Sequence, residues 1–413
     1  MKFVLYGLNY APELSGIGKY TGDMEAWFSE NAHQVDVLTS PPYYPEWSVH
    51  SGYRNRWFSR SPLRNGTVVR CPLYVPSRPS TFKRLVHLVS FSVSSGLALS
   101  MKLFDKPDFV ICIQPTLFCA PLTLLYARLT GAKAVMHVQD YEIDAMFGLD
   151  LMRRNFLSRI AKKIESWLMR RFDLVTTISY SMIENAKQKG VDGDKLRLFP
   201  NWADVSFVTP SVNGAELKVE WGFCEEDKIV LYAGNIGKKQ GLDIVIEVAE
   251  QFRTESNTHF VLVGDGVEAN ALKSDATTRD LPNVHFKPLQ SWSRVPEMLA
   301  LADVHLVIQK CGAADVVLPS KLTNILSAGG HAIVTAEKET ELGLLTERFP
   351  GIYTRIDPED SRLLGSSLRV LLNEDLSKPN MVARNYALEY LSRDKILTRF
   401  ESDLEDLLVD VES

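Results

Sequence analysis

The stretch "KFVLYGLNYAPELSGIGKYTGDM", Lys2 to Met24, joins an apolar run to a long loop and then to a glycine pair that opens an amphipathic segment. A strand, a loop and a helix in this order form the first unit of a doubly wound parallel sheet. Gly16 and Gly18 leave backbone N–H groups at the start of the expected helix, where they can face an anion. The same glycines could instead serve only a tight turn. The stretch therefore predicts an α/β fold, with a candidate anion site at the end of its first strand.

Two familiar phosphate-binding motifs do not fit this stretch. A Walker loop requires a glycine five residues before the Gly-Lys pair and a Ser or Thr after the lysine, but Glu13 and Tyr20 occupy those positions. A dinucleotide fingerprint requires a third glycine three residues after Gly18, where the chain has Thr21. A loop that binds an anion here would therefore be neither a Walker loop nor a dinucleotide fingerprint.

Strand-like and helix-like segments alternate through the first half of the chain, and the alternation starts again after Asn201. Runs typical of buried strands occupy 2–7, 34–40, 67–75, 109–114, 134–140 and 174–179. A second set occupies 228–234, 259–264, 284–289, 304–310 and 331–337. Two such sets predict two Rossmann-like, doubly wound α/β domains facing a central cleft. We expect the first domain over 1–205, the second over 206–385, and a C-terminal helix over 386–413 that packs back on the first domain.

The composition excludes several classes of protein. A formal net charge of −5 over 413 residues argues against a nucleic-acid coat protein. The five cysteines lie far apart and form no Cys-x-x-Cys pair, as expected of reduced, buried thiols in a cytoplasmic protein. The N-terminus does not resemble a signal peptide, and no run of about 18 apolar residues predicts a spanning helix. The Asp-x-Asp triplet at 192–194 lies between a helix and a further expected strand, "LRLFPN" (196–201), so it reads as an exposed turn and we predict no metal site.

Ligands of open parallel sheets bind beyond the carboxyl ends of the strands. The stretch "YAGNIGKKQG" (Tyr232 to Gly241) stands at such an end, where its glycines allow a close backbone approach and Lys238 and Lys239 offer charge to a phosphate. A glycine-rich turn with two solvated lysines is the alternative. "VGDG", which ends at Gly266, follows the next strand and adds a second site of close approach.

A third strand end leads into "LPSKLTNILSAGG", Leu318 to Gly330. Pro319 and Ser320 are typical of a helix start, with Ser320 as the expected cap. The helix dipole and Lys321 would both favour a negative group at this N-terminus. An ordinary capped helix is the alternative interpretation.

The stretch "MHVQDYEID", from Met136, ends a strand of the first domain. His137 and Gln139 share one face of that strand, and Asp140 begins the loop. These side chains could contact a sugar hydroxyl. A lone strand histidine is more often a core residue whose hydrogen bonds are satisfied inside the domain, which is the alternative for His137.

Two basic stretches remain. Lys83 and Arg84 precede a largely apolar run that is too polar to span a membrane. The segment 151–172 interleaves apolar residues at helical spacing with basic ones, among them Arg153, Arg154, Arg159, Lys162 and Lys163. Basic amphipathic helices of this type lie on anionic membrane surfaces. A core-packing helix with a basic solvent face is the alternative.

Taken together, "SGIGKYT", "FPNWAD", "YAGNIGKKQG", "VGDG" and "PSKLTNILSAGG" follow one another as in the retaining GT-B glycosyltransferases of family 4. "NYAPELSGIGKYTG", "PPYYPEW", "PTLFCAP" and "HVQDYEIDAM" resemble the colanic acid biosynthesis fucosyltransferases more closely. The resemblance implies a GT-B fold and metal-independent transfer with retention at the anomeric carbon. It implies GDP-fucose as the donor, held mainly by the second domain. The implied acceptor is a lipid-linked oligosaccharide, modified by a peripheral protein at the inner face of the cytoplasmic membrane.

The resemblance also implies roles for individual residues. Many family members carry Arg and Lys where this chain has Asn235 and Gln240, so the phosphate charge falls to Lys238, Lys239 or Lys321. Asn324 stands in place of the second Glu of the family's paired-glutamate motif, and Asp315 corresponds to the first. His137, Gln139 and Asp140 are the catalytic candidates. The full set of expected donor contacts is Gly16, Ile17, Gly234, Asn235, Lys238, Lys239, Gln240, Gly264, Asp265, Asp315, Ser320, Lys321, Leu322, Thr323 and Asn324.

Three rival functions stay open at this point. A nucleotide-sugar epimerase or hydrolase could use the same two-domain fold. A non-catalytic nucleotide-sugar-binding assembly protein is a second alternative. A nicotinamide oxidoreductase is a third, although neither half of the chain carries the dinucleotide fingerprint.

Overall fold

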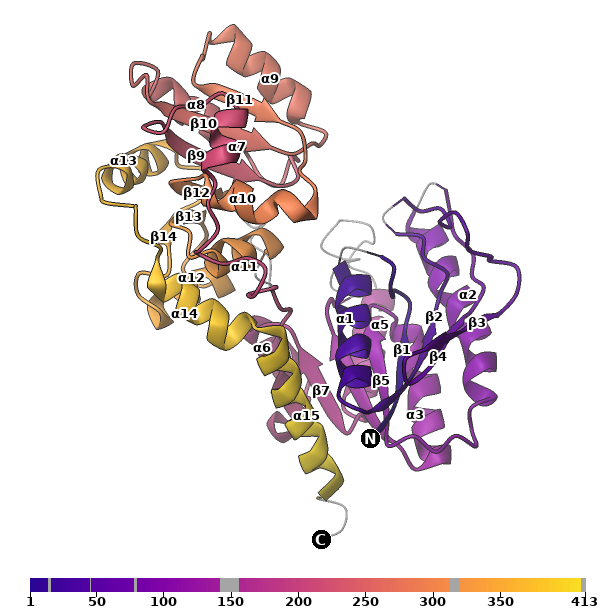
Figure 1. Cartoon of the computed structure of the whole chain (residues 1–413). Coiled ribbons are helices and arrows are strands. Elements are labelled where there is room, and N and C mark those ends of the chain that lie inside the picture. Colours follow the sequence, from indigo (N-terminus) through magenta and orange to yellow (C-terminus); the bar gives the residue numbers. More distant parts are fainter. Residues whose placement is uncertain (14–15, 45, 78–79, 142–155, 312–318, 410–413) are drawn as a thin grey trace. The chain divides into compact units, whose positions relative to one another are not determined.

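The computed structural model describes residues 1–13, 16–44, 46–77, 80–141, 156–311 and 319–409. The chain folds into two compact units, each with its own parallel sheet (Figure 1). The first unit comprises residues 1–201 and 397–413, and the second comprises residues 202–396. The two doubly wound α/β sheets that the sequence predicts are therefore confirmed.

The sheet of the first unit has eight strands in the order β3-β4-β2-β1-β5-β6-β7-β8. All neighbours are parallel except β3, which pairs antiparallel with β4 at the edge. The central strands are buried on both faces, which explains their continuous apolar sequences. The strands are β1 (Lys2–Gly7), β2 (Gln34–Thr39), β3 (Ser59–Leu63), β4 (Gly66–Arg70), β5 (Phe109–Gln114), β6 (Lys133–Val138), β7 (Leu174–Thr177) and β8 (Leu196–Leu198).

Helices cover both faces of this sheet. On one face the Tyr6 hydroxyl is 2.7 Å from the Ser95 hydroxyl of α2, and Met136 lines a pocket with Met169 of α5. On the other face Phe3 stacks on Phe28 of α1, with ring centroids 4.4 Å apart. The helical segments are α1 (Gly16–Glu30), α2 (Thr81–Ser100), η1 (Leu117–Cys119), α3 (Ala120–Thr130), α5 (Phe156–Met169), α6 (Tyr180–Gln188), η2 (Gly193–Lys195) and α15 (Arg393–Val409).

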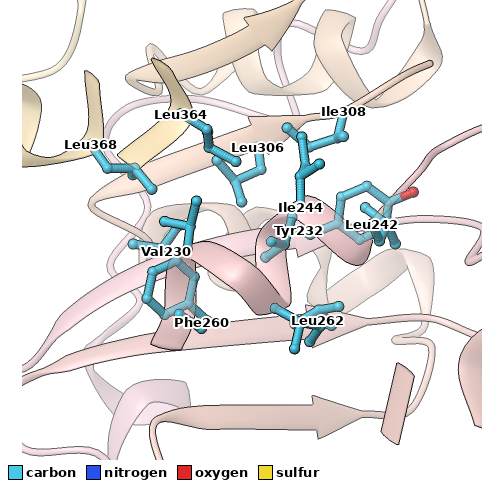
Figure 2. Packing of buried hydrophobic residues seen from close by; sticks show 14 of the residues in the cluster. Val230, Tyr232, Leu242, Ile244, Phe260, Leu262, Leu306, Ile308, Leu364 and Leu368 are labelled. Atoms are coloured by element: carbon cyan, nitrogen blue, oxygen red, sulfur yellow. The ribbon is translucent and has the colours of Figure 1, made fainter. Parts of the chain in front are cut away.

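The second unit has six parallel strands in the order β11-β10-β9-β12-β13-β14. They are β9 (Lys228–Ala233), β10 (Thr258–Val263), β11 (Val284–Lys287), β12 (Val304–Val307), β13 (Ala332–Thr335) and β14 (Thr354–Ile356). Side chains of β9, β10 and β12 interdigitate with those of two helices, as Figure 2 shows for Val230, Phe260, Leu306, Ile244 and Leu364. The helical segments are α7 (Ala215–Glu220), α8 (Asp243–Gln251), α9 (Ala269–Thr278), η3 (Trp292–Arg294), α10 (Val295–Ala300), α11 (Ser320–Ser327), α12 (Glu341–Arg348), α13 (Ser361–Leu372), α14 (Met381–Tyr386) and the π-helix η4 (Ala387–Leu391).

The units divide after residues 201 and 396, whereas the boundaries expected from the sequence lie after residues 205 and 385. The physical reason is the packing of α14 and η4 in the second unit. Arg384 donates hydrogen bonds to the carbonyl oxygens of Val205 and Ser327. Leu391 is buried in an apolar cluster that also contains Ala203, and its carbonyl accepts a hydrogen bond from the Ala203 N–H. Chain segments on both sides of each expected boundary therefore belong to the second unit.

From Leu397 onward, α15 belongs to the first unit. Phe400 is 1% exposed, and its ring stacks on Phe199 with centroids 4.1 Å apart. It also approaches Phe28 of α1, at 6.3 Å between centroids. Through Phe400, the C-terminal helix thus packs on the first helix of this unit and on the residue that follows its last strand.

We expect Phe400→Ala to lower the free energy of unfolding by about 3–5 kcal/mol, because it removes a fully buried aromatic ring. Urea denaturation followed by circular dichroism measures the change. Val409→Ala is the matched control on the same helix, since Val409 is exposed. A Phe400→Ala protein as stable as the control would contradict the aromatic contact.

Buried histidines make stability depend on pH. Burial lowers the pKa of His137 in the first unit to about 3 and that of His305 in the second to about 4. Both imidazoles are therefore neutral when folded but gain a proton on unfolding below about pH 6.5. We expect the free energy of unfolding to fall between pH 7.5 and 5, by roughly 2 kcal/mol for each imidazole at pH 5. Urea denaturation at a series of pH values tests this, and a flat profile over that range would count against it.

Candidate functional site

The loop after β9 and the loop after β10 are joined by backbone hydrogen bonds. The Gly234 N–H donates to the Val263 carbonyl (2.9 Å), and the Ile236 N–H donates to the Asp265 carbonyl (2.9 Å). A Cβ at Gly264 would lie 2.0 Å from the Gly234 carbonyl oxygen, so this close approach requires glycine. Both loops stand at the carboxyl ends of adjacent parallel strands, where ligands of such sheets bind.

Gly266 makes a second close contact between the loops that follow β9 and β10. A Cβ at this position would lie 2.2 Å from the Ile236 carbonyl oxygen, and its φ of +157° also favours glycine. Its N–H donates to the carboxylate of Asp265 (2.7 Å). The "VGDG" stretch thus has a structural role in holding the two loops together. The expected donor contact of the exposed Asp265 stays a prediction.

Lys321, near the start of α11, reaches back to the end of β9. Its ammonium donates a hydrogen bond to the Tyr232 hydroxyl (3.0 Å) and lies 4.3 Å from the centre of the Tyr232 ring. The Tyr232 hydroxyl in turn donates to the Asn235 carbonyl (2.6 Å). Burial raises the pKa of Tyr232 above its usual range, so the phenol stays neutral. A Cβ at Gly234 would be 3.4 Å from the Lys321 Nζ, which places this charge directly on the glycine loop.

The other loop residues differ in what they can offer a ligand. Lys238 and Lys239 are exposed. Gln240 accepts the Gly237 N–H (3.1 Å) and so braces the loop from within. The side chain of Asn235 is exposed beside it.

Lys310 is a basic residue that the sequence analysis missed. It follows β12, and its N–H donates to the Lys239 carbonyl (3.0 Å). A Cβ at Gly241 would lie 2.8 Å from its Cε, so the lysine stem packs against the end of the loop. Its position just after a strand was the available signal.

The start of α11 differs from the expected cap. Pro319 is the N-cap residue, and no hydrogen bond from a side chain caps the described part of the helix start. Ser320 is the first helical residue, and its carbonyl accepts the Thr323 hydroxyl (2.8 Å). The expectation that Ser320 caps the helix is therefore wrong, because the extended Pro319 places Ser320 inside the first turn.

The other residues of this helix that are expected to contact the donor differ in how exposed they are. The Leu322 side chain is fully buried in the apolar core, and Thr323 is buried as well. Asn324 is half-buried. Asp315 lies outside the described residues.

In the first unit, His137 is a core residue. It is 3% exposed, and its Nδ1 is 2.9 Å from the Thr176 hydroxyl oxygen. Its ring also meets Phe199 edge-on, with centroids 4.8 Å apart. Gln139 is buried too, whereas Asp140 is exposed at the end of β6. Asp140 borders a small pocket lined by Gln114, Leu117, Met136, Val138, Tyr141, Glu165 and Met169.

The glycine pair of the opening loop has two different environments. Gly16 begins α1 with a φ of +60°, and a Cβ there would meet nothing within 4 Å. A Cβ at Gly18 would instead lie 2.6 Å from a carboxylate oxygen of Glu13. Glu13 is buried and accepts the backbone N–H groups of Tyr43 and Tyr44, each at 3.1 Å. Gly18 therefore packs on a buried carboxylate that the sequence analysis did not single out, and the anion contact of Gly16 and Ile17 stays a prediction.

The basic residues expected at a membrane are on the surface of the first unit. Lys83 and Arg84 are exposed in the first turn of α2, and Arg159, Lys162 and Lys163 are exposed on α5. Arg153 and Arg154 lie outside the described residues. Among the helices that the structure describes, none has the length and apolar character needed to cross a bilayer.

Comparison with known proteins connects both units to one family. Residues 15–202 match the model of the glycosyl transferase 4-like domain, and residues 214–387 match that of the glycosyl transferases group 1. WcaI of Escherichia coli (strain K12), provisionally named a colanic acid biosynthesis glycosyl transferase, is 46% identical over 409 residues. That match covers 98% of this chain and 100% of the relative.

Solved structures show the same fold at low sequence identity. Sucrose-phosphate synthase from Thermosynechococcus elongatus matches with a TM-score of 0.73 at 11% identity, covering 99% of each chain. HepE of Anabaena, solved in complex with UDP, matches with a TM-score of 0.69 at 14% identity, covering 98% of this chain and all of the other. With two parallel-sheet α/β units of the GT-B type and a relative 46% identical over nearly its whole length, the chain belongs to the group 1 glycosyltransferases with a glycosyltransferase 4-like N-terminal domain.

Proposed function

We propose that this glycosyltransferase moves L-fucose from GDP-fucose, with retention, onto a lipid-linked oligosaccharide in the biosynthesis of a colanic-acid-like exopolysaccharide. The name of the Escherichia coli relative supports the pathway. The sequence stretches shared with colanic acid fucosyltransferases support the donor sugar and the stereochemistry. The proposed acceptor and donor sugar rest on that resemblance, whereas the donor site rests on the geometry of the second unit.

The observation that carries the donor site is the position of Lys321 against the glycine loop. Lys238 and Lys239 are exposed, whereas Lys321 is held by Tyr232 beside Gly234. Cleavage of a sugar–diphosphate bond builds negative charge on the leaving group, and a fixed cation with nearby backbone N–H groups stabilises that charge. Asn235 and Gln240 are uncharged, and Lys321 on α11 supplies the positive charge in their place. We propose that this arrangement works without a metal ion.

Asp140 is the strongest of the three catalytic candidates. It is exposed at a strand end, whereas His137 and Gln139 are buried. A neutral, buried imidazole that is already hydrogen-bonded to Thr176 has little freedom to meet a sugar. We therefore assign contact with the reacting sugar to Asp140 and a positioning role to the two buried residues.

We further propose that the chain works at the inner face of the cytoplasmic membrane, where a lipid-linked acceptor would lie. Exposed basic residues support this location through attraction to anionic lipids. The described ones are Lys83, Arg84, Arg159, Lys162 and Lys163. Arg153 and Arg154 are assigned the same role from the sequence alone.

We expect Lys321→Ala to reduce kcat/KM for sugar transfer about 100-fold or more, because it removes a fixed charge from the leaving group. Lys238→Ala, an exposed lysine of the same loop, is the matched control and should lose less than about tenfold. The assay follows label from GDP-fucose into a lipid-linked acceptor. Free or epimerised sugar without acceptor labelling would favour the hydrolase or epimerase, and absence of any turnover with donor binding intact would favour a binding protein.

A thermal-shift screen against GDP-, UDP- and dTDP-sugars tests the proposed donor. GDP-fucose at about 100 times its Kd should raise Tm by roughly 5 °C or more, because ligand binding to the folded state adds about 2.7 kcal/mol. The shift should shrink in the Lys321→Ala protein. A larger shift with a UDP- or dTDP-sugar would contradict the assignment of GDP-fucose.

A further inference from the structure

The helices on one side of the sheet in the first unit carry many exposed apolar side chains. The helices α2, α3 and α5 cover this side, as the contacts of Tyr6, Cys112 and Met136 with them show. These three residues pair in register across β1, β5 and β6, so they point to the same face. On α3 the exposed apolar side chains include Leu125 and Leu129, and on α5 they include Ile160, Ile164 and Trp167.

The arrangement on α2 is a continuous stripe. Phe82, Val86, Val89, Val93 and Leu97 follow one another at intervals of three or four residues, so they lie on one face of the helix. Val93 is 65% exposed and Leu97 is 57% exposed. At about 1.5 Å per residue the stripe is more than about 20 Å long. By contrast, α1 on the opposite side of the sheet exposes no large apolar side chain.

The described residues of α2, α3 and α5 include no exposed acidic side chain. From residue 47 to residue 104 the sequence contains nine Lys or Arg residues and neither Asp nor Glu. The sequence of α3 also has no acidic residue. The one acid in α5, Glu165, is turned inward, where it is 3% exposed and accepts a hydrogen bond from Lys189 (2.6 Å). In a chain with a net charge of −5, this side is locally basic and apolar.

An exposed aromatic segment adjoins the N-terminal half of α2. Asn55 exchanges hydrogen bonds with the backbone of Leu73 (2.8 and 2.9 Å), and the next N–H, of Tyr74, donates to Ser90 of α2 (2.9 Å). Near Asn55, Trp57 is 79% exposed and Phe58 is also exposed. They alternate with exposed arginines, namely Arg54, Arg56 and Arg60. Aromatic rings beside arginines are typical of the boundary between water and lipid.

We propose that this side of the first unit, defined by α2, α3, α5 and the segment 53–60, docks on an anionic phospholipid bilayer, with the apolar stripe of α2 entering the boundary between headgroups and acyl chains. A second copy of the chain fits less well, because it would bring two basic surfaces together. A nucleic acid would leave the apolar stripe without a partner. This inference deepens the proposed membrane location by naming its anchor, and it does not depend on the donor sugar.

The test compares two triple variants in sedimentation with vesicles of phosphatidylglycerol and phosphatidylethanolamine. Val89→Ser, Val93→Ser and Leu97→Ser together remove the centre of the stripe. Binding should fall about 100-fold, since burying each of these three side chains favours binding by about 1 kcal/mol and about 1.4 kcal/mol corresponds to a tenfold change. The matched control replaces exposed apolar residues of the second unit, Val219→Ser, Leu363→Ser and Val370→Ser, and should bind like the wild type.

A labelled variant locates the contact directly. An environment-sensitive fluorophore at Leu97→Cys, with the exposed Cys224 and Cys311 changed to Ser, should shift its emission to the blue when vesicles are added. The same label at Glu30→Cys, on the opposite side of the sheet, should not shift.

Three outcomes would overturn the proposal. The first is a wild-type protein that does not bind these vesicles, and the second is a stripe variant that binds as tightly as the control. The third is a wild-type dimer that becomes monomeric in the stripe variant while vesicle binding is unchanged, which would assign the stripe to a second copy. Thermal shift with GDP-fucose should be the same in both triple variants. A stripe variant that loses vesicle binding but keeps its thermal shift with GDP-fucose therefore tests the membrane contact independently of the proposed donor.

Discussion

The absence of a side chain at Gly264 and Gly266 is the constraint on which the geometry of the proposed donor site depends. Only without a Cβ can these residues lie against the carbonyl oxygens of Gly234 and Ile236. This contact sets the path of the loop after β9, and through it the position of the Asn235 carbonyl that accepts the Tyr232 hydroxyl. Tyr232 in turn holds the Lys321 ammonium. A charge on α11 is thus positioned by backbone packing between two other strand ends.

The architecture was largely predictable from the sequence, because buried parallel strands give continuous apolar runs. The strands that were missed are those for which this signal is weak. β3 lies at the sheet edge and is mostly exposed, so its sequence "SRSPL" is polar. β14 has only three residues. The strand expected over 67–75 ends at Arg70, and the Cys71 N–H still donates to the Thr39 carbonyl at the end of β2 (2.7 Å).

The candidate site was less predictable, because its roles depend on contacts between distant residues. The sequence offers Lys238, Lys239 and Lys321 as equal sources of charge. Only the contact between Lys321 and Tyr232, 89 residues apart, distinguishes them. His137 shows the same limit, because the sequence around a strand histidine is the same whether its side chain faces a ligand or, as here, Thr176. The outward stripe of α2 was also hidden in the sequence, because α2 carries apolar residues on its inner face as well.

The division of the first unit into two chain segments has a consequence for synthesis. The second unit is continuous from 202 to 396, so all its residues have been translated before Leu397, where the chain returns to the first unit. Phe400, the ring that stacks on Phe199 of the first unit, is translated only after the whole second unit. Phe199 and Phe28 are therefore without this partner in the nascent chain. The half of the protein that is translated first is the half that is completed last.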